Sequence, residues 1–137
     1  KQVTVEGFPV NEAPEILQKD GRIFLIYSAS DTGTPDYCLG MLTAEANADL
    51  LKPESWVKSP TPVFSRLDAA GVFAPGHNGF FKSPDGREDW IVYHAKTTSD
   101  YTYGGRNTRV QPFTWNPDGT PHFGDPLPLN AVLEEPS

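Results

Sequence analysis

Residues 15–28 read EILQKDGRIFLIYS, two apolar runs separated by the turn Lys19-Asp20-Gly21. An Asp-Gly pair between apolar runs is a strong local signal for a β-hairpin, because both turn residues tolerate a positive φ. Asp85-Gly86, followed by the apolar run 89–95, repeats this arrangement, and Asp85 lies 65 residues after Asp20. The sequence therefore predicts a β protein that contains a repeated unit.

Further strands are expected between segments rich in turn-forming residues. Strands are expected over residues 37–43, 56–58, 62–64, 79–82 and 106–115, with a loop over 97–105 and a strand-like alternation over 1–7. Residues 47–53 are expected to form one helical turn that Pro53 ends, and residues 74–78 a glycine-rich turn. Repeats of this length with about four short strands each are typical of β-propeller blades.

Composition limits the class of protein. The chain has 137 residues, enough for one domain with a core, and its 12 Gly and 14 Pro fit a turn-rich β protein. A net charge of −7 argues against nucleic acid and anionic membranes as partners. The segment 1–7 lacks the apolar stretch of a signal peptide. The single cysteine, Cys38, allows no internal disulfide and is expected to be a buried, inert thiol.

Four motifs stand in a fixed order along the chain. They are Asn11-Glu12-Ala13-Pro14, residues 74–78 (APGHN), residues 90–95 (WIVYHA) and residues 106–121 (RNTRVQPFTWNPDGTP). Together they resemble glycoside hydrolase family 43, and within it the α-L-arabinofuranosidases and exo-arabinan hydrolases. The resemblance implies a five-bladed β-propeller with a central active-site pocket. Residues 1–137 would form its carboxyl-terminal half, about two to three blades of the catalytic domain without the amino-terminal blades.

Glu12 is the first candidate catalytic residue. Glycosidic cleavage needs a carboxylic acid that protonates the leaving oxygen, and the pKa of such an acid must be raised for it to keep its proton. The resemblance implies that Glu12 is this general acid, held at the start of a strand by Pro14 and tuned by an aromatic-lined pocket and a neighbouring carboxylate. From spacing alone Glu12 reads as a surface glutamate, and Glu15 is interpreted as structural.

Two further site residues follow from the resemblance. It implies that His77 lies on the propeller axis near a bound ion, often calcium, whose preference for oxygen would require waters in the shell. The alternative is a histidine that only holds the turn and the blades together. It also implies that Arg106 contacts sugar hydroxyls or the carboxylate of the acid; the alternative is an exposed charge. No organic cofactor is expected.

Other polar and aromatic residues are interpreted as structural. Arg109 is three residues from Arg106, an odd step that places it on the opposite strand face. His94 lies in an apolar strand and is expected to be a hydrogen-bonded core histidine. The aromatic residues Phe80, Phe81 and Trp90 are expected to contribute mostly to the core between blades.

The resemblance implies hydrolysis of terminal α-L-arabinofuranosyl linkages in arabinan or arabinoxylan by an inverting mechanism. The run 108–115 (TRVQPFTW) favours this over the β-xylosidase activity of the same family, which stays open, as does a non-catalytic carbohydrate-binding half-propeller. The family's catalytic base is an Asp whose context does not occur here, since the one Asp-Pro pair is Asp125-Pro126 in the Pro-rich tail. The chain is therefore expected to act with a separate amino-terminal half, outside the cell.

Overall fold

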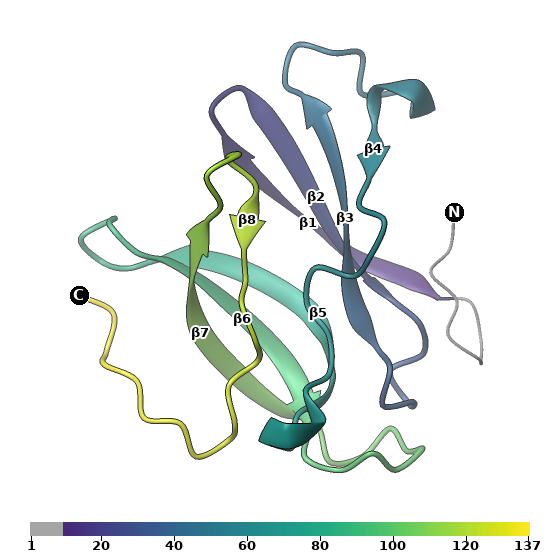
Figure 1. Cartoon of the computed structure of the whole chain (residues 1–137), viewed down its shortest axis with the longest axis vertical. Coiled ribbons are helices and arrows are strands. Elements are labelled where there is room, and N and C mark those ends of the chain that lie inside the picture. Colours follow the sequence, from purple (N-terminus) through teal and green to yellow (C-terminus); the bar gives the residue numbers. More distant parts are fainter. Residues whose placement is uncertain (1–9) are drawn as a thin grey trace.

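The computed structural model describes residues 10–137, which form two four-stranded antiparallel sheets (Figure 1). The first sheet contains β1 (Asn11–Lys19), β2 (Arg22–Ala29), β3 (Cys38–Glu45) and β4 (Val57–Lys58). The second contains β5 (Phe73–Lys82), β6 (Asp89–Lys96), β7 (Asn107–Trp115) and β8 (Pro121–His122). Strand order follows the sequence in both sheets, which confirms the all-β prediction. The strand expected over residues 1–7 lies outside the described residues.

The turn between β1 and β2 has the predicted geometry. Lys19 pairs with Arg22, and the two residues between them, Asp20 and Gly21, have φ values of 50° and 76°. Two consecutive residues with positive φ match the right-handed twist of the adjoining strands. The Asp-Gly signal therefore fixes the register of β1 against β2 next to the turn.

We expect Gly21→Ala to destabilise the protein by about 1–2 kcal/mol, because an L-residue is strained at positive φ. The strain acts alone here, since an added Cβ would meet open space. Gly104→Ala is the matched control, because Gly104 is not among the positive-φ glycines and its added Cβ would make only an ordinary contact. Urea unfolding of both variants tests this, and equal stabilities would contradict it.

The first strand of each sheet carries the same irregularity. The regular pairing of β1 with β2 is interrupted after Glu12. That of β5 with β6 is interrupted twice, first between Phe73 and Gly76, where Ala74 has a φ of 53°, and again after Gly76. The next residue in each strand, Ala13 or His77, has a φ of 49° or 51°. The prediction of a turn over 74–78 was wrong, because pairing with β6 resumes beyond the irregularity and the segment remains a bulged strand.

The bulges also align the second strands of the two sheets. Ser28 of β2 pairs with Glu12, the residue before the bulge of β1, and His94 of β6 pairs with Gly76, the residue before the second bulge of β5. This alignment matches IYSA in β2 with VYHA in β6, so that Tyr27 and Tyr93 occupy equivalent positions. The predicted internal repeat is therefore present in the structure as two equivalent sheets.

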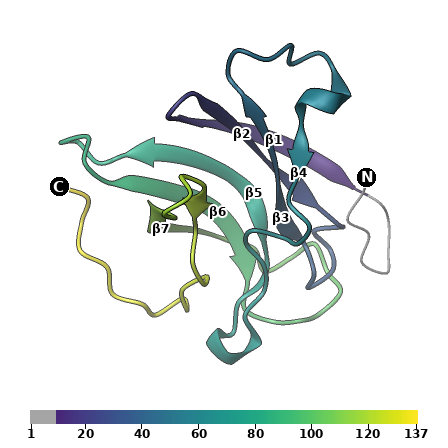
Figure 2. The ribbon, with the colours of Figure 1, turned by 45° about the horizontal axis from the view of Figure 1, so that its top comes forward.

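The main core lies between the two sheets, which form separate layers with β5 against the first sheet (Figure 2). Its buried members are Phe24, Ile26, Leu39, Met41, Phe64, Val72, Ile91, Tyr93, Ala95, Phe113 and Phe123. Phe64, from the connection between the sheets, packs edge-on against Tyr93 with ring centroids 4.9 Å apart. Tyr93 thus marks the face of the second sheet that packs on the first.

Most of the residues assigned to structure were assigned correctly. Cys38 is buried, and burial raises the pKa of its thiol to about 11. Arg109 is buried and donates to Asn107 and to two main-chain carbonyls. Trp90 is buried and Phe80 packs against the core, whereas Phe81 stacks on Trp90 and stays 38% exposed.

The predicted helical turn over 47–53 was wrong. The helical segment is the 3₁₀ helix η1, Pro53–Ser55, which begins at the proline instead of ending there. Proline is tolerated in the first turn because the amide it lacks would have no helical partner at that position. A second 3₁₀ helix, η2 (Asp68–Ala70), precedes β5.

Candidate functional site

The structure brings Glu12 and His77 together at the two bulges. Nδ1 of His77 lies 3.7 Å from Oε1 of Glu12, so the first strands of the two sheets meet at this point. The backbone amide of His77 donates to Oγ of Ser28 at 2.8 Å, and Ser28 is fully buried. The bulge of β5 is therefore fixed to the middle of the first sheet, which holds the imidazole beside the carboxylate.

Tyr37, which the sequence did not indicate, completes this cluster. Its hydroxyl donates to Oε1 of Glu12 at 2.5 Å. Burial raises the pKa of Tyr37, and the hydrogen bond to Glu12 raises it further, against smaller lowering contributions that include the charge of Arg106. The phenol thus remains a protonated donor to Glu12.

The ring of Tyr37 is held by two residues of the second sheet. It stacks on the imidazole of His94 with centroids 5.7 Å apart and an interplanar angle of 7°. A Cβ at Gly76, which pairs with His94 across the sheet, would collide with the ring. The glycine of the APGHN motif is therefore required for close approach, and this was the available sequence signal for Tyr37.

His94 forms one side of this site and is half-buried, and one of its two ring nitrogens lacks the predicted hydrogen bond in the described part of the chain. Its Nδ1 is buried and has no hydrogen-bond partner among residues 10–137. The pKa of His94 is lowered from its ordinary 6.5 to about 4, chiefly by burial and then by the charges of Arg106 and His77, against a raising effect of Glu12. The imidazole is consequently neutral at the pH values where most hydrolases work.

We expect the stability of the protein to fall as the pH drops from about 6.5 to about 4. The unfolded chain protonates His94 in this range while the folded chain does not, so stability rises with pH across it. Urea unfolding at pH 7 and pH 5 checks this against His94→Gln, which should lose less stability between the two values. Equal losses in the two proteins would show that His94 does not make this contribution.

Arg106 acts on the site through its charge. It immediately precedes β7, and its Nε donates to the carbonyl of Tyr103 at 2.9 Å, so this donor is directed to the loop and not to Glu12. Its charge nevertheless lowers the pKa values of Tyr37 and His94. The guanidinium therefore lies near the cluster, exposed to solvent.

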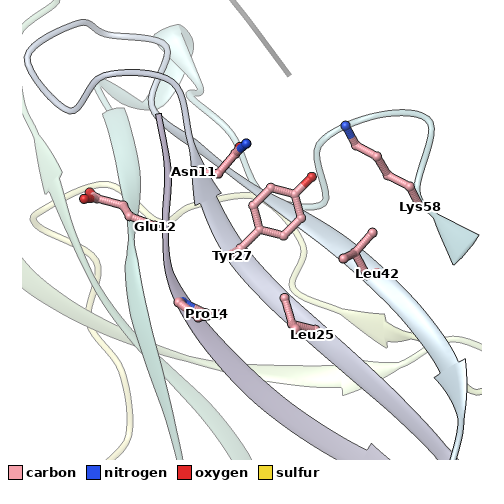
Figure 3. Close-up of a pocket in the computed structure, with 7 residues that line it drawn as sticks. All are labelled: Asn11, Glu12, Pro14, Leu25, Tyr27, Leu42 and Lys58. Carbon is pink, nitrogen blue, oxygen red and sulfur yellow. The ribbon is translucent and has the colours of Figure 1, made fainter. Parts of the chain in front are cut away.

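The site is open on one side. The side chains of Glu12 and His77 are 42% and 59% exposed. A cavity of about 280 Å³ lies beside β1, lined by Asn11, Glu12, Pro14, Leu25, Tyr27, Leu42 and Lys58 (Figure 3). The carboxylate of Glu12 points away from Tyr27, the aromatic ring of this cavity. The described residues supply a wall of Tyr37 and His94 rather than the expected enclosing aromatic pocket.

The residues present do not by themselves form a calcium site. Within residues 10–137, no group of three or more His, Cys, Asp or Glu side chains could hold a metal ion. Calcium prefers six to eight oxygen ligands, and Glu12 is the carboxylate that approaches His77. A calcium ion at His77 stays a prediction.

The helices of residues 10–137 lack the length and apolar character of a membrane span.

Comparison with known proteins gives a consistent picture. The family model of glycosyl hydrolases family 43 matches residues 1–121. The extracellular exo-alpha-(1->5)-L-arabinofuranosidase of Streptomyces avermitilis is 48% identical over 126 residues, covering 88% of this chain and 26% of the relative. Alpha-L-arabinofuranosidase 43 of Humicola insolens is 48% identical over 127 residues, covering 89% of this chain and 26% of that relative. The chain spans about a quarter of the length of these curated relatives.

Solved structures resemble the two-sheet arrangement. The α-L-arabinofuranosidase from Lactobacillus brevis superposes with a TM-score of 0.84 and 50% sequence identity, covering 90% of this chain and 39% of that protein. A thermostable family-43 glycoside hydrolase gives a TM-score of 0.76 at 32% identity, covering 93% of this chain and 38% of that protein.

Proposed function

The chain belongs to family 43 of the glycosyl hydrolases, and on this basis we propose that it works as part of an α-L-arabinofuranosidase. The substrate would be a terminal α-L-arabinofuranosyl group of arabinan or arabinoxylan. The observation that carries the proposal is the carboxylate of Glu12, held by Tyr37 beside His77 where the two sheets meet. The names of the arabinofuranosidases that share nearly half of its residues support the same substrate.

In the proposed mechanism, Glu12 donates a proton to the leaving oxygen. Inversion requires a second carboxylate about 6.5–9.5 Å from the acid, with room for the attacking water between them. We propose that this base lies outside the 137 residues. Arg106 is exposed, and its charge reaches Tyr37 and His94, whose pKa values it lowers. We propose that its guanidinium donates hydrogen bonds to the sugar hydroxyls.

We also propose that the two sheets are blades of a five-bladed propeller. The Tyr93 face of the second sheet packs on the first through Phe64. Tyr27 is the equivalent residue of the first sheet, and it lines the open cavity of Figure 3. A preceding blade would fill that cavity with its own counterpart of Phe64. This supports the proposal that the chain works with amino-terminal blades, as a separate half or as one polypeptide.

Denaturing intact-mass spectrometry of natively purified protein tests how those blades are supplied. A second polypeptide that co-purifies with a 15.1 kDa species would support a separate half. A single mass near that of a full-length relative would support one polypeptide. A single 15.1 kDa species with hydrolase activity would overturn the need for further blades.

The activity itself is tested on the natively purified protein with the 4-nitrophenyl glycosides of α-L-arabinofuranose and β-D-xylopyranose. We expect preference for the arabinofuranoside, and the β-anomer as first product in a proton NMR time course. Preference for the xyloside would assign a β-xylosidase, and binding of arabino-oligosaccharide without hydrolysis would assign a binding module. Activity in the culture medium rather than in washed cells would support an extracellular enzyme, as the name of the Streptomyces avermitilis relative suggests.

A further inference from the structure

We propose that Tyr37 is a positioning residue for the acid: its hydroxyl occupies one oxygen of Glu12 and leaves the other oxygen to carry the transferable proton. The inference rests on the proposed function, since it concerns the same carboxyl group. It adds a residue that neither the sequence motifs nor the comparisons single out. It also assigns different tasks to the two oxygen atoms of Glu12.

The two contacts of the carboxyl group converge on the same atom. The hydroxyl of Tyr37 donates to Oε1 at 2.5 Å, and Nδ1 of His77 lies 3.7 Å from that oxygen. A protonated carboxyl group has one O–H donor and one carbonyl-type acceptor. The hydroxyl of Tyr37 stays protonated and donates to Oε1. Oε1 therefore takes the acceptor role. The proton is thereby directed to Oε2, and the side chain that carries it is 42% exposed.

Tyr37 can direct the proton because it has little freedom to move. Its ring is fully buried, stacks on the imidazole of His94 and lies too close to the backbone of Gly76 for a Cβ there. The loop before it is tied to β5 by a hydrogen bond from the amide of Ala74 to the carbonyl of Pro35, 2.8 Å long. The second sheet therefore determines where the hydroxyl stands, and through it the orientation of a carboxyl group on the first sheet.

A buried tyrosine could also serve stability alone, and leaving-group dependence separates the two roles. Substrates with a poor leaving group need the proton, whereas a 2,4-dinitrophenolate leaves without it. Loss of positioning should therefore slow hydrolysis of α-1,5-arabinobiose far more than that of 2,4-dinitrophenyl α-L-arabinofuranoside. Loss of folded protein lowers both rates by the same factor.

The experiment compares Tyr37→Phe and Tyr93→Phe in the complete, natively assembled enzyme. Tyr93→Phe is the matched control, because it removes a buried hydroxyl that donates to Gln111 at 2.8 Å and not to Glu12. We expect Tyr37→Phe to lower kcat/KM on arabinobiose by about tenfold or more and on the dinitrophenyl substrate by less than about threefold. Tyr93→Phe should change both substrates equally. Thermal melting of each variant confirms that it is folded.

Equal effects of Tyr37→Phe on the two substrates, or no effect on either, would overturn the inference. Glu12→Gln, assayed in parallel, separates this failure from that of the proposed function. If Glu12→Gln selectively impairs arabinobiose and Tyr37→Phe does not, Glu12 is the acid and Tyr37 does not position it. If neither variant discriminates between the substrates, the acid itself has been misassigned and both proposals fail.

Discussion

Replacement of Glu12 by glutamine is expected to lower kcat/KM on arabinobiose by about 10²–10⁴-fold, the usual contribution of a general acid. Glutamine keeps the shape of the side chain and an oxygen that can accept the hydrogen bond of Tyr37, so the folded structure should persist. What it removes is the proton that the leaving oxygen requires. Steady-state kinetics on arabinobiose and on an aryl arabinofuranoside measure the loss.

Glu15→Gln is the matched control for this experiment. Glu15 lies on the same strand, is exposed and pairs across the sheet with Ile26, so the same chemical change there should leave kcat/KM unchanged. Retention of full activity by Glu12→Gln would refute its role as the acid. Equal losses in the two variants would point to damage of β1 rather than to lost chemistry.

Lys96→Met is expected to destabilise the protein by about 1–3 kcal/mol. Lys96 is 1% exposed, and its ammonium donates to the carbonyls of Gly33, Asp100 and Thr102 at 3.2, 2.8 and 3.2 Å. Methionine has a similar length but leaves these acceptors without a donor, and an unsatisfied buried group costs about 1–3 kcal/mol. Chemical denaturation of the assembled enzyme measures the loss.

Lys82→Met serves as the control for Lys96. The Lys82 side chain is 63% exposed and pairs with Asp89 at 2.6 Å, and a pair of this kind is worth about 0–1 kcal/mol. Equal stability changes in the two variants would show that the buried ammonium does not hold the loop. The loop bears on the proposed function because residues 97–105 lead directly to Arg106, the residue proposed to bind the sugar.

Local signals were sufficient to place both hairpins, but not for the shape of the second turn. There Lys82 pairs with Asp89, residues 83–88 form the loop, and Asp85 does not share the positive φ of Gly86. Asp20 and Gly21 adopt the positive φ values that the Asp-Gly pair predicts, and the apolar runs on either side become β1 and β2. The repeat was also predictable, since turn and strand recur in the same order in both sheets. These features depend on neighbours in the sequence, which a single sequence displays.

The features that the sequence did not predict correctly depend on contacts between residues far apart in the chain. Tyr37 joins Glu12 only because the second sheet brings Gly76 and His94 against its ring. His94 reads as a core residue from its apolar neighbours, yet its Nδ1 finds no partner among residues 10–137. The APGHN segment contains the residues of a turn, but pairing with β6 keeps it in a strand.

The shared bulge gives positions at which to look for the missing base. In both sheets the first strand turns its backbone at the same point, and the residues there face one another: Glu12 in one strand and His77 in the other. Each further sheet built on this unit would present its own bulge to the same centre. The carboxylate that activates water should therefore be sought at or next to that position in the first strand of another sheet, whatever its distance along the chain.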